Sequence, residues 1–499
     1  MPLPDSSGIS SFGVPLYDER TPTSAPAGID SQIPSPAAQI ADRGGNGADK
    51  GTGSAAETPG DETAFGDAAP LQSTIGDVLT DQITDAANKQ PPWYSAHVQA
   101  TIVTQKHNVF PAPYTGPESL LPSEPSATSE TSTLFLAARL AKSTELVFDP
   151  EVIAGRGFSN VFGLAGFPNG EMNRVTSLQP TPYIARLYLR HVWGLGGAQE
   201  EVPDGFNQVA GGRDVDRVTM VVGKMAPTDF FDDNRYSHDP RTQFLDWALM
   251  YNGAWDYPAD LRGYSYGGTI DYNRQNWALR YGIFAEPTAA NFLPLDPKFL
   301  QAHGQVVELE ERYRVNDRPG KLRLLTYLNQ AHMGSYRLAL AEMPVNPDIT
   351  QTRAYRIKYG FGASLEQELT EELGLFSRLG WNNGQTESWA FTEIDSTASV
   401  GLVLKGNRWS RPQDQVGLAI LANGLSAIHR AYLAAGGLGF QVGDGRLNYG
   451  LEEILETYYR LELRPGVQVS TAFQGVNNPA YNRDRGPVAI GTIRVHFEF

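Results

Sequence analysis

The chain has 499 residues, of which 19% are charged and none is cysteine, and its formal net charge is −16. The lack of cysteine excludes a disulfide-stapled domain, a cysteine-ligated zinc site and a cysteine nucleophile, and the acidic balance argues against nucleic-acid binding. No stretch reaches the ~18 uncharged apolar residues of a membrane-spanning helix, so a helical membrane protein is not expected.

Residues 1–90 differ in composition from the rest of the chain. They are rich in Ala, Gly, Ser and Pro and carry thirteen acidic residues against four basic ones. Such a segment buries too little apolar surface to offset the entropy of ordering, so we predict a disordered acidic extension, more simply a solvated leader than a pore plug. Met1–Asp5 has neither the basic nor the apolar region of a signal peptide. No signal peptide is therefore visible, and we expect the start to be trimmed or misassigned if the protein is exported.

From Trp93 onward, apolar and polar side chains alternate along many segments of about ten residues. Val307 and Leu309 alternate with Glu308 and Glu310, and the chain ends in the same way at residues 493–499. A period of two is typical of β-strands. In a soluble sandwich the apolar face would form the core, whereas in an outer-membrane barrel it faces lipid and the polar face lines the interior.

The connectors between these segments differ in length. Residues 463–466 and 382–384 are predicted to be tight turns, and residues 110–133 and 200–214 to be long loops. Short turns on one side and long loops on the other are typical of a membrane barrel. We therefore predict an all-β protein in which residues 91–499 form a transmembrane antiparallel β-barrel of about sixteen strands.

Aromatic side chains near the predicted strand ends suit the girdles that such barrels place at the lipid headgroups. The predicted girdle residues are Trp93, Tyr94, Trp193, Trp255, Tyr257, Trp381, Trp389, Tyr458 and Tyr459.

Motifs for enzymatic chemistry are scarce. The chain has no His-Glu-x-x-His and no phosphate-binding Gly-rich loop. The acidic residues Glu452, Glu453 and Glu456 could in principle serve a glycosidase, but we expect no catalytic residues. The eight histidines show no ligand spacing, so we expect neither a metal nor a cofactor.

Several long segments resemble the OprB family of carbohydrate-selective outer-membrane porins. They begin at His97 (HVQATIVTQKHNVFPAPYTGPESL), Phe148 (FDPEVIAGRGFSNVFGLAGFPNGE), Val221 (VVGKMAPTDFFDDNRYSHDPRTQFLDWAL), Val416 (VGLAILANGLS), Asp444 (DGRLNYGLEEILETYYRLEL) and Asn478 (NPAYNRDRGPVAIGTIRVHFEF). They occur in the order found in the family, and the resemblance extends over the run from His97 to the C-terminus, about four fifths of the chain.

The resemblance implies passive diffusion of mono- or oligosaccharides across the bacterial outer membrane through a charged, aromatic-lined constriction. Carbohydrate solutes and outer-membrane lipid are the implied partners, with the barrel-assembly machinery reading the last strand, which ends at Phe499. Pathway residues expected within the matched segments are Glu151, Glu171, Arg186, Arg190, Lys224, Asp229, Asp239, Arg241, Asp246 and Trp247. We add Arg280, Glu308 and Glu310 only because they lie on the predicted polar face of their strands.

Two alternatives remain at this point. A secreted β-rich glycan-binding protein or glycosidase would be soluble without detergent. A polysaccharide-export barrel would share the fold but would need a lumen dominated by arginine.

Overall fold

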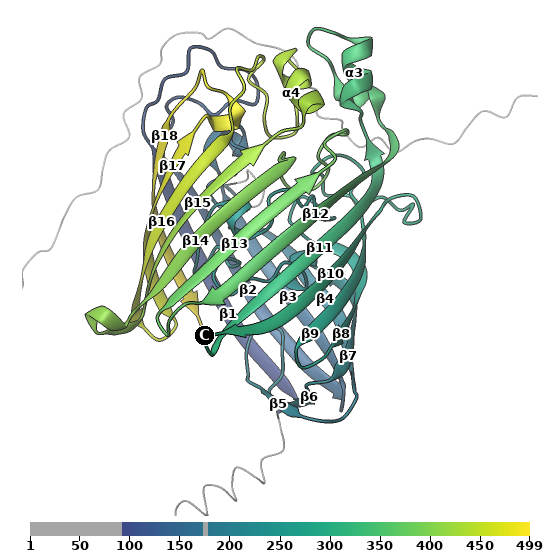
Figure 1. Ribbon diagram of the computed structural model, residues 1–499, viewed down its shortest axis with the longest axis vertical. Helices are drawn as coiled ribbons and strands as arrows, with labels where there is room; N and C mark the ends of the chain where they lie inside the picture. The colour runs from purple at the N-terminus through teal and green to yellow at the C-terminus, as the bar shows by residue number, and fades with distance from the viewer. Residues whose placement is uncertain (1–91, 173–177) are drawn as a thin grey trace, which may run out of the picture. The chain divides into compact units, whose positions relative to one another are not determined.

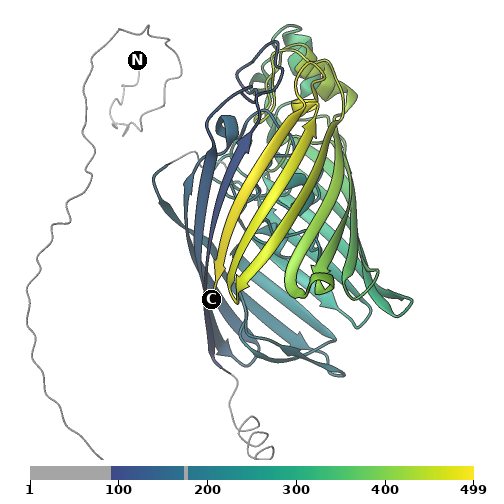
Figure 2. The same ribbon diagram turned by 90° about the vertical axis from the view of Figure 1, so that its left-hand side faces the viewer.

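The computed structural model describes residues 92–172 and 178–499 and shows, within them, sixteen antiparallel strands closed into a barrel (Figures 1 and 2). The wall strands are β1 (Tyr94–His107), β2 (Ala127–Ala141), β3 (Thr144–Gly155), β4 (Thr181–Gly194), β7 (Arg217–Met225), β8 (Ser265–Asn273), β9 (Trp277–Ala285), β10 (His303–Val315), β11 (Arg318–Met333), β12 (Ala354–Glu368), β13 (Leu373–Asn382), β14 (Ser396–Gly406), β15 (Arg411–Gly424), β16 (Glu452–Arg464), β17 (Val467–Asn477) and β18 (Val488–Glu498). Pairing of β1 with β18 closes the barrel. The predicted fold and strand number are confirmed.

The remaining elements lie in the connections. A separate hairpin joins β4 to β7 and consists of β5 (Gln199–Val202) and β6 (Gly211–Asp214). The helices are α2 (Trp247–Met250), α3 (Tyr336–Glu342) and α4 (Ala427–Ala434), with 3-10 turns η1 (Phe158–Val161), η2 (Pro227–Asp229), η3 (Ile349–Thr352), η4 (Asn407–Trp409) and η5 (Pro479–Tyr481). Among the described residues, no helix has the length and apolar character needed to cross a membrane.

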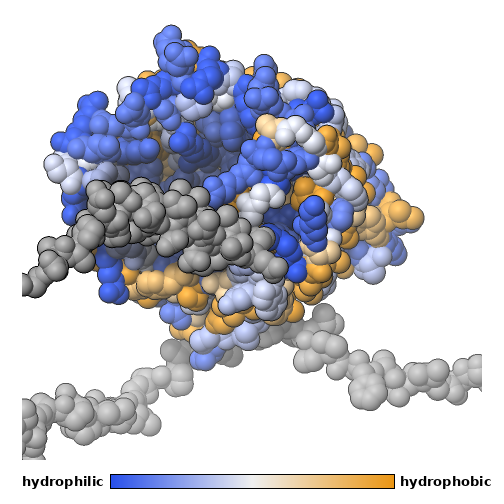
Figure 3. Space-filling view, turned by 90° about the horizontal axis from the view of Figure 1, so that it is seen from below, coloured by the Kyte–Doolittle hydropathy of each residue, from blue (hydrophilic) through white to orange (hydrophobic). Residues whose placement is uncertain are grey.

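Alternation in the sequence becomes alternation between the two faces of the wall. On β10, Glu308 and Glu310 are buried inside the barrel, whereas Val307 and Leu309 are 38% and 44% exposed on the outside. On β18, Arg494 and His496 are buried, and Ile493 is exposed. Seen from below, hydrophilic side chains surround a hollow and hydrophobic ones cover much of the flank (Figure 3). The predicted inversion, with apolar side chains outward, therefore holds for these strands.

Strand β4 interrupts this alternation. The register between β3 and β4 shifts where Asp149 pairs with Arg186 and Pro150 pairs with Ile184. The shift leaves Ile184 exposed on the outside although Arg186 and Tyr188, two and four residues later, turn inward. A β-bulge of this kind changes which side chains share a face.

The two ends of the barrel differ in their connections. We call the end with both chain ends of the barrel and most short turns the turn end, and the opposite end the loop end. The connection at 465–466 is a tight turn, as predicted, but residues 383–395 form a long loop that begins within the predicted turn at 382–384. Residues 127–133 of the predicted loop 110–133 belong to β2. The predicted loop at 200–214 contains the β5–β6 hairpin and lies at the turn end.

The predicted aromatic girdle is only partly correct. Trp93, Tyr94, Trp193 and Trp381 are exposed near strand ends, as expected. Trp255, Tyr257, Trp389 and Tyr458 are buried instead, because their segments fold into the barrel or, for Tyr458, because the side chain lies on the inner face of β16.

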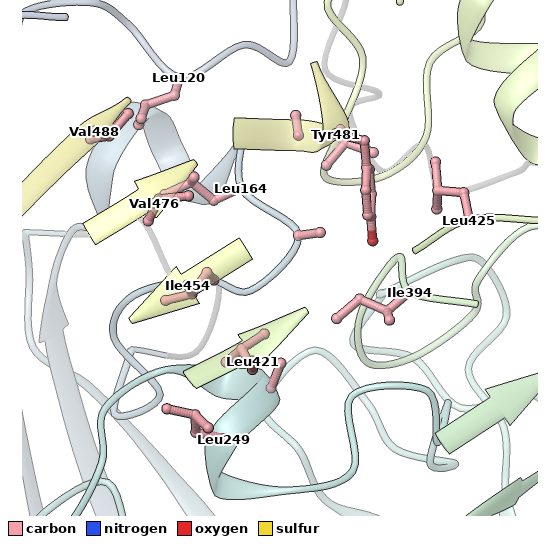
Figure 4. Packing of buried hydrophobic residues seen from close by; sticks show 14 of the residues in the cluster. Leu120, Leu164, Leu249, Ile394, Leu421, Leu425, Ile454, Val476, Tyr481 and Val488 are labelled. Carbon is pink, nitrogen blue, oxygen red and sulfur yellow. The ribbon is translucent and has the colours of Figure 1, made fainter. Parts of the chain in front are cut away.

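Apolar packing also occurs inside the barrel. Leu421 and Ile454 from the wall belong to the same buried cluster as Leu164 and Leu249, which lie in connections at the loop end (Figure 4). Burial of these groups stabilises the inward position of the connections. The interior of the barrel therefore contains apolar clusters as well as the predicted polar face.

The predicted disordered extension at residues 1–90 lies outside the described residues.

Candidate functional site

One long connection, residues 226–264 between β7 and β8, folds into the barrel; we call it the inward loop. It contains α2, whose first turn is capped by Asp246, since the Asp246 carboxylate accepts a hydrogen bond of 2.8 Å from the backbone N–H of Ala248. An N-cap carboxylate satisfies one of the otherwise unpaired N–H groups of a helix. Asp246, one of the predicted pathway residues, thus caps α2 in the structure.

Carboxylates of the wall hold the backbone of the inward loop. Glu456 on β16 accepts hydrogen bonds from the N–H groups of Leu245 and Asp246 at 2.6 and 3.0 Å. Glu308 on β10 accepts one from the N–H of Asp232 at 2.7 Å. Buried carboxylates need such partners because an unpaired charge is costly away from water. Several inward charges of the wall thus serve to hold the loop.

Arginines of the wall hold the same loop through its carbonyl groups. Arg378 on β13 donates to the Asp232 carboxylate at 3.0 Å and to the carbonyl oxygens of Leu249 and Ser237 at 2.6 and 2.7 Å. Arg494 on β18 donates to the carbonyl oxygen of Gln243 at 2.8 Å. The inward loop is therefore attached to opposite parts of the wall.

A cavity of about 110 Å³ lies beside this loop; we call it the central cavity. Its charged lining consists of three arginines, Arg186, Arg241 and Arg262, and four carboxylates, Glu151, Glu171, Asp229 and Asp260. Its other lining side chains include Thr131, Trp247, Tyr251, Tyr257, Tyr264, Asn291 and Phe391. The site is thus narrow, mixed in charge and rich in aromatic rings.

Arg186 on β4 forms a two-pronged ion pair with Asp229 of the inward loop. Nε and Nη2 of Arg186 each lie 2.6 Å from a carboxylate oxygen of Asp229. Nη1 lies 3.3 Å from the buried carboxylate of Asp149. A planar guanidinium held at two edges is a rigid donor.

Arg241 lies on the inward loop between two carboxylates. Its Nε is 2.9 Å from Glu171 and its Nη2 is 3.7 Å from Glu151. Glu151 also accepts hydrogen bonds from Thr133, at 2.6 Å, and from the hydroxyl of Tyr183. Burial raises the pKa of the Glu171 carboxyl, and the Arg241 charge opposes this shift.

The aromatic part of the cavity is also held in place. Trp247 stacks on Phe391 with 5.6 Å between ring centroids and 15° between ring planes, and Tyr257 lies 4.4 Å from the same ring. The carboxylate of Asp256 accepts hydrogen bonds from the N–H groups of Trp389, Ala390 and Phe391 at 2.7 to 3.0 Å. One carboxylate therefore positions the backbone that carries the central ring.

The structure brings six of the predicted pathway residues together around the central cavity. They are Glu151, Glu171, Arg186, Asp229, Arg241 and Trp247. Asp239 lies next to this group and accepts a hydrogen bond from the N–H of Arg241 at 3.0 Å. The Arg241 charge and this bond lower the pKa of Asp239 although burial opposes the shift.

The other predicted residues lie elsewhere. Arg280 pairs with Glu308 at 2.8 Å and with Glu310 at 3.2 Å in a network on the wall, outside the cavity lining. Lys224 lies 6.0 Å from the ring of Tyr264, also outside the lining. Arg190 lines a second cavity near the turn end.

Sequence reasoning missed the segment 260–264 and the ring of Phe391. Asp260, Arg262 and Tyr264 lie 13 to 17 positions after the predicted pathway residue Trp247, and the same mixture of charged and aromatic residues continues there. Phe391 gave no such signal, because it reaches the cavity from a connection 144 positions after Trp247 in the sequence.

A closed sixteen-stranded barrel with an apolar outer wall, a loop folded into the lumen and a narrow charged cavity defines a porin. The sequence model described as "Carbohydrate-selective porin, OprB family" matches residues 132–499, and the chain belongs to this family. No curated protein matches the chain.

A solved structure agrees with this assignment at the level of the fold. The chain is similar to the high-pH structure of OprB from Pseudomonas putida, with a TM-score of 0.63 and 14% identity over 85% of this chain and 97% of that one. It also matches the outer-membrane channel DcaP of Acinetobacter baumannii, with a TM-score of 0.45 and 8% identity over 81% of this chain and 97% of that one.

Family and fold are therefore those of a passive sugar channel of the outer membrane, not of an enzyme. They give no support to the alternative of a secreted glycan-binding protein or glycosidase.

Proposed function

We propose that the central cavity is the selective constriction of this carbohydrate porin and that mono- or oligosaccharides pass it one at a time. The observation that carries the proposal is the placement of the Arg186–Asp229 and Arg241–Glu171 pairs around the same cavity as Trp247 and Phe391. Guanidinium and carboxylate groups exchange hydrogen bonds with sugar hydroxyls, and flat rings suit the apolar faces of pyranoses. Passage requires weak binding, because a tightly held solute would block the channel.

We further propose that the chain acts without catalysis. The carboxylates considered for a glycosidase have other partners: Glu452 accepts from the N–H groups of Gly166 and Ala480 at 2.6 and 2.8 Å, and Glu456 holds the inward loop. Glu453 is exposed on the outer face of β16 and receives a hydrogen bond of 2.9 Å from Asn477. This arrangement supports structural roles for the three groups.

The proposal extends to the setting of the barrel. Residues 91–499 would form one barrel domain whose exposed apolar side chains contact lipid, with the turn end toward the periplasm, as in other outer-membrane barrels. The last strand, with exposed Ile493 and Phe499, would be read by the barrel-assembly machinery.

The test is electrical. Purified protein in planar bilayers should give discrete conductance steps that millimolar mono- or disaccharide reduces reversibly. Millimolar affinity corresponds to about −4 kcal/mol. Discrete steps that no sugar reduces would limit the protein to a general diffusion channel, and a lack of steps would contradict the channel function itself.

A further inference from the structure

The connection between β4 and β7, residues 195–216, is the longest at the turn end, and it does not lie flat across that end. We call it the strap. Its two short strands, β5 and β6, carry a turn at residues 203–210. This turn contacts inward-facing side chains of β1, β2, β3 and β4, namely Ser95, Phe135, Asp149 and Arg190, so it lies in the lumen on the turn-end side of the central cavity.

Polar and aromatic contacts hold the strap against β1 and β2. Asp204 accepts a hydrogen bond of 2.7 Å from the hydroxyl of Ser95 and lies 3.3 Å from Nε2 of His97. The ring of Phe206 stacks on Phe135 with 4.5 Å between centroids. Both polar and apolar contacts therefore fix the strap on this side of the lumen.

Arginines fix the other part of the turn by its backbone. Arg139 donates to the carbonyl oxygens of Val209 and Ala210 at 2.9 and 3.1 Å, and Arg190 donates to that of Asn207. Arg190 was predicted as a pathway residue; here it holds the strap and lines a cavity of about 660 Å³ between the strap and the wall. A solute-sized space thus remains beside the strap.

Asn207 links the strap to the central cavity. Its backbone is left-handed, with φ of +59°, a conformation that asparagine tolerates better than most residues. With its amide nitrogen toward the wall, that nitrogen lies 2.8 and 2.9 Å from the two carboxylate oxygens of Asp149. Asp149 is fully buried and also pairs with Arg186 of the central cavity.

These contacts form a chain from the turn end to the constriction. Asn207 orients the Asp149 carboxylate, and this carboxylate, together with Asp229, fixes the guanidinium of Arg186. We propose that Asn207 is a positioning residue that holds Arg186 in the central cavity through Asp149, so that the strap takes part in setting sugar selectivity. The proposal rests on the proposed function of the central cavity.

Two variants separate this role from a structural one. N207G keeps the left-handed turn and removes the amide, whereas N207D keeps the shape and places a carboxylate against Asp149. The matched control is N316G, since Asn316 is an exposed turn-end asparagine with a left-handed φ of +49°. Folding of each variant is checked by its heat-modifiable migration on a denaturing gel.

The measurement is the sugar concentration that halves the single-channel current in planar bilayers. We expect N207G to raise it about threefold and N207D to raise it more, because one charge-assisted hydrogen bond is lost in the first and replaced by repulsion in the second. The double variant D149N/N207D restores an amide–carboxylate contact with exchanged partners. We expect it to bring the half-block sugar concentration part of the way back to that of the parent.

The proposal would be overturned if sugar blocks the parent protein but N207G and N207D have the same half-block concentration as the control N316G. A parent protein that sugar does not block would instead overturn the proposed function of the cavity, and this inference with it.

Discussion

Arg186 and Asp229 are separated by 43 positions in the sequence, yet their side chains meet in two parallel hydrogen bonds of 2.6 Å each. The first residue belongs to the wall strand β4 and the second to the end of η2 in the inward loop. The pair therefore does two things at once: it attaches the loop to the wall, and it presents an immobilised guanidinium to the central cavity. A channel that must bind its solute weakly gains specificity from such fixed groups, because little ordering is needed when the solute arrives.

Removal of this guanidinium should weaken the constriction. We expect R186A to raise the single-channel conductance and to raise the half-block sugar concentration on the order of tenfold. A tenfold change corresponds to about 1.4 kcal/mol, close to the lower limit of about 1.5 kcal/mol for a hydrogen bond to a charged group. The measurement is current block in planar bilayers. R408A is the matched control, since the Arg408 side chain is 66% exposed in an ion pair at the turn end. Equal block in R186A and the parent would show that the sugar does not depend on this side of the cavity.

The attachment of the inward loop can be tested separately. Arg378 is buried and holds Asp232 together with two carbonyl groups of the loop. R378M keeps a long side chain but leaves Asp232 without its charge partner, at a cost of roughly 3–5 kcal/mol. We expect the barrel still to form and the current to become larger and noisier, because the loop no longer stays in one position.

Single-channel recording, with heat-modifiable migration to verify the barrel, measures both effects. R314M serves as control because Arg314 is exposed near the turn at residues 316–317. A quiet R378M channel of parental conductance would mean that the other attachments of the loop suffice.

The strand pattern was predictable, since a period of two directly reports which face a side chain occupies. The faces of β10 and β18 follow from their sequences alone. On β4 the same reasoning is insufficient, because the register shift at Asp149 and Pro150 depends on the pairing with β3. The sequence of β4 alone does not predict such a register shift.

The interior was predictable only in part. Six residues of the cavity lining were predicted because the resemblance marked the segments that carry them. The roles of Glu456 and Arg378 were not, because each binds a loop more than a hundred positions away. A charged side chain on an inward-facing position can meet either water or the backbone of a folded loop, and only the three-dimensional path of the loop decides between these environments.

The proposed contact between the outer wall and lipid predicts that the cost of a charge on this face depends on its depth in the bilayer. Leu418 and Leu463 are 47% and 58% exposed. Leu418 pairs with Thr457 in the middle of β16, so Leu463 lies about 20 Å further along the tilted strand toward the turn end, at ~3.3 Å per residue. Arginine on the lipid face costs about 2–4 kcal/mol at the bilayer midplane and ~0–1 kcal/mol near its surface.

We therefore expect L418R to reduce the folded fraction in liposome refolding and L463R to leave it almost unchanged. The folded fraction is read from unboiled and boiled samples on a denaturing gel. Equal folded fractions of the two variants would contradict a lipid-facing wall, because on a surface in water the cost of an added arginine would not depend on the position along the strand.

The charge of the central cavity should depend on pH through Glu171, a residue of the connection between β3 and β4. Burial raises the pKa of its carboxyl above the usual value of 4.5, against the opposing charge of Arg241. As pH falls through the raised pKa, Glu171 takes up a proton, so the cavity becomes more positive at a pH where ordinary carboxyls are still ionised. Asp260 acts in the same direction, since burial also raises its pKa.

Protonation of Glu171 also contributes to the stability of the folded protein. Because the folded state binds this proton more tightly than the unfolded state does, the contribution of Glu171 to stability is fully present below the usual pKa and is lost as pH rises through the raised one.

Because protonation of Glu171 makes the cavity more positive, lower pH should shift the reversal potential in a salt gradient toward anion selectivity, beginning above the usual carboxyl range. In E171Q this shift should be smaller, with only the part due to Asp260 remaining. A reversal potential with the same pH dependence in E171Q and the parent would show that Glu171 does not change its charge in this range.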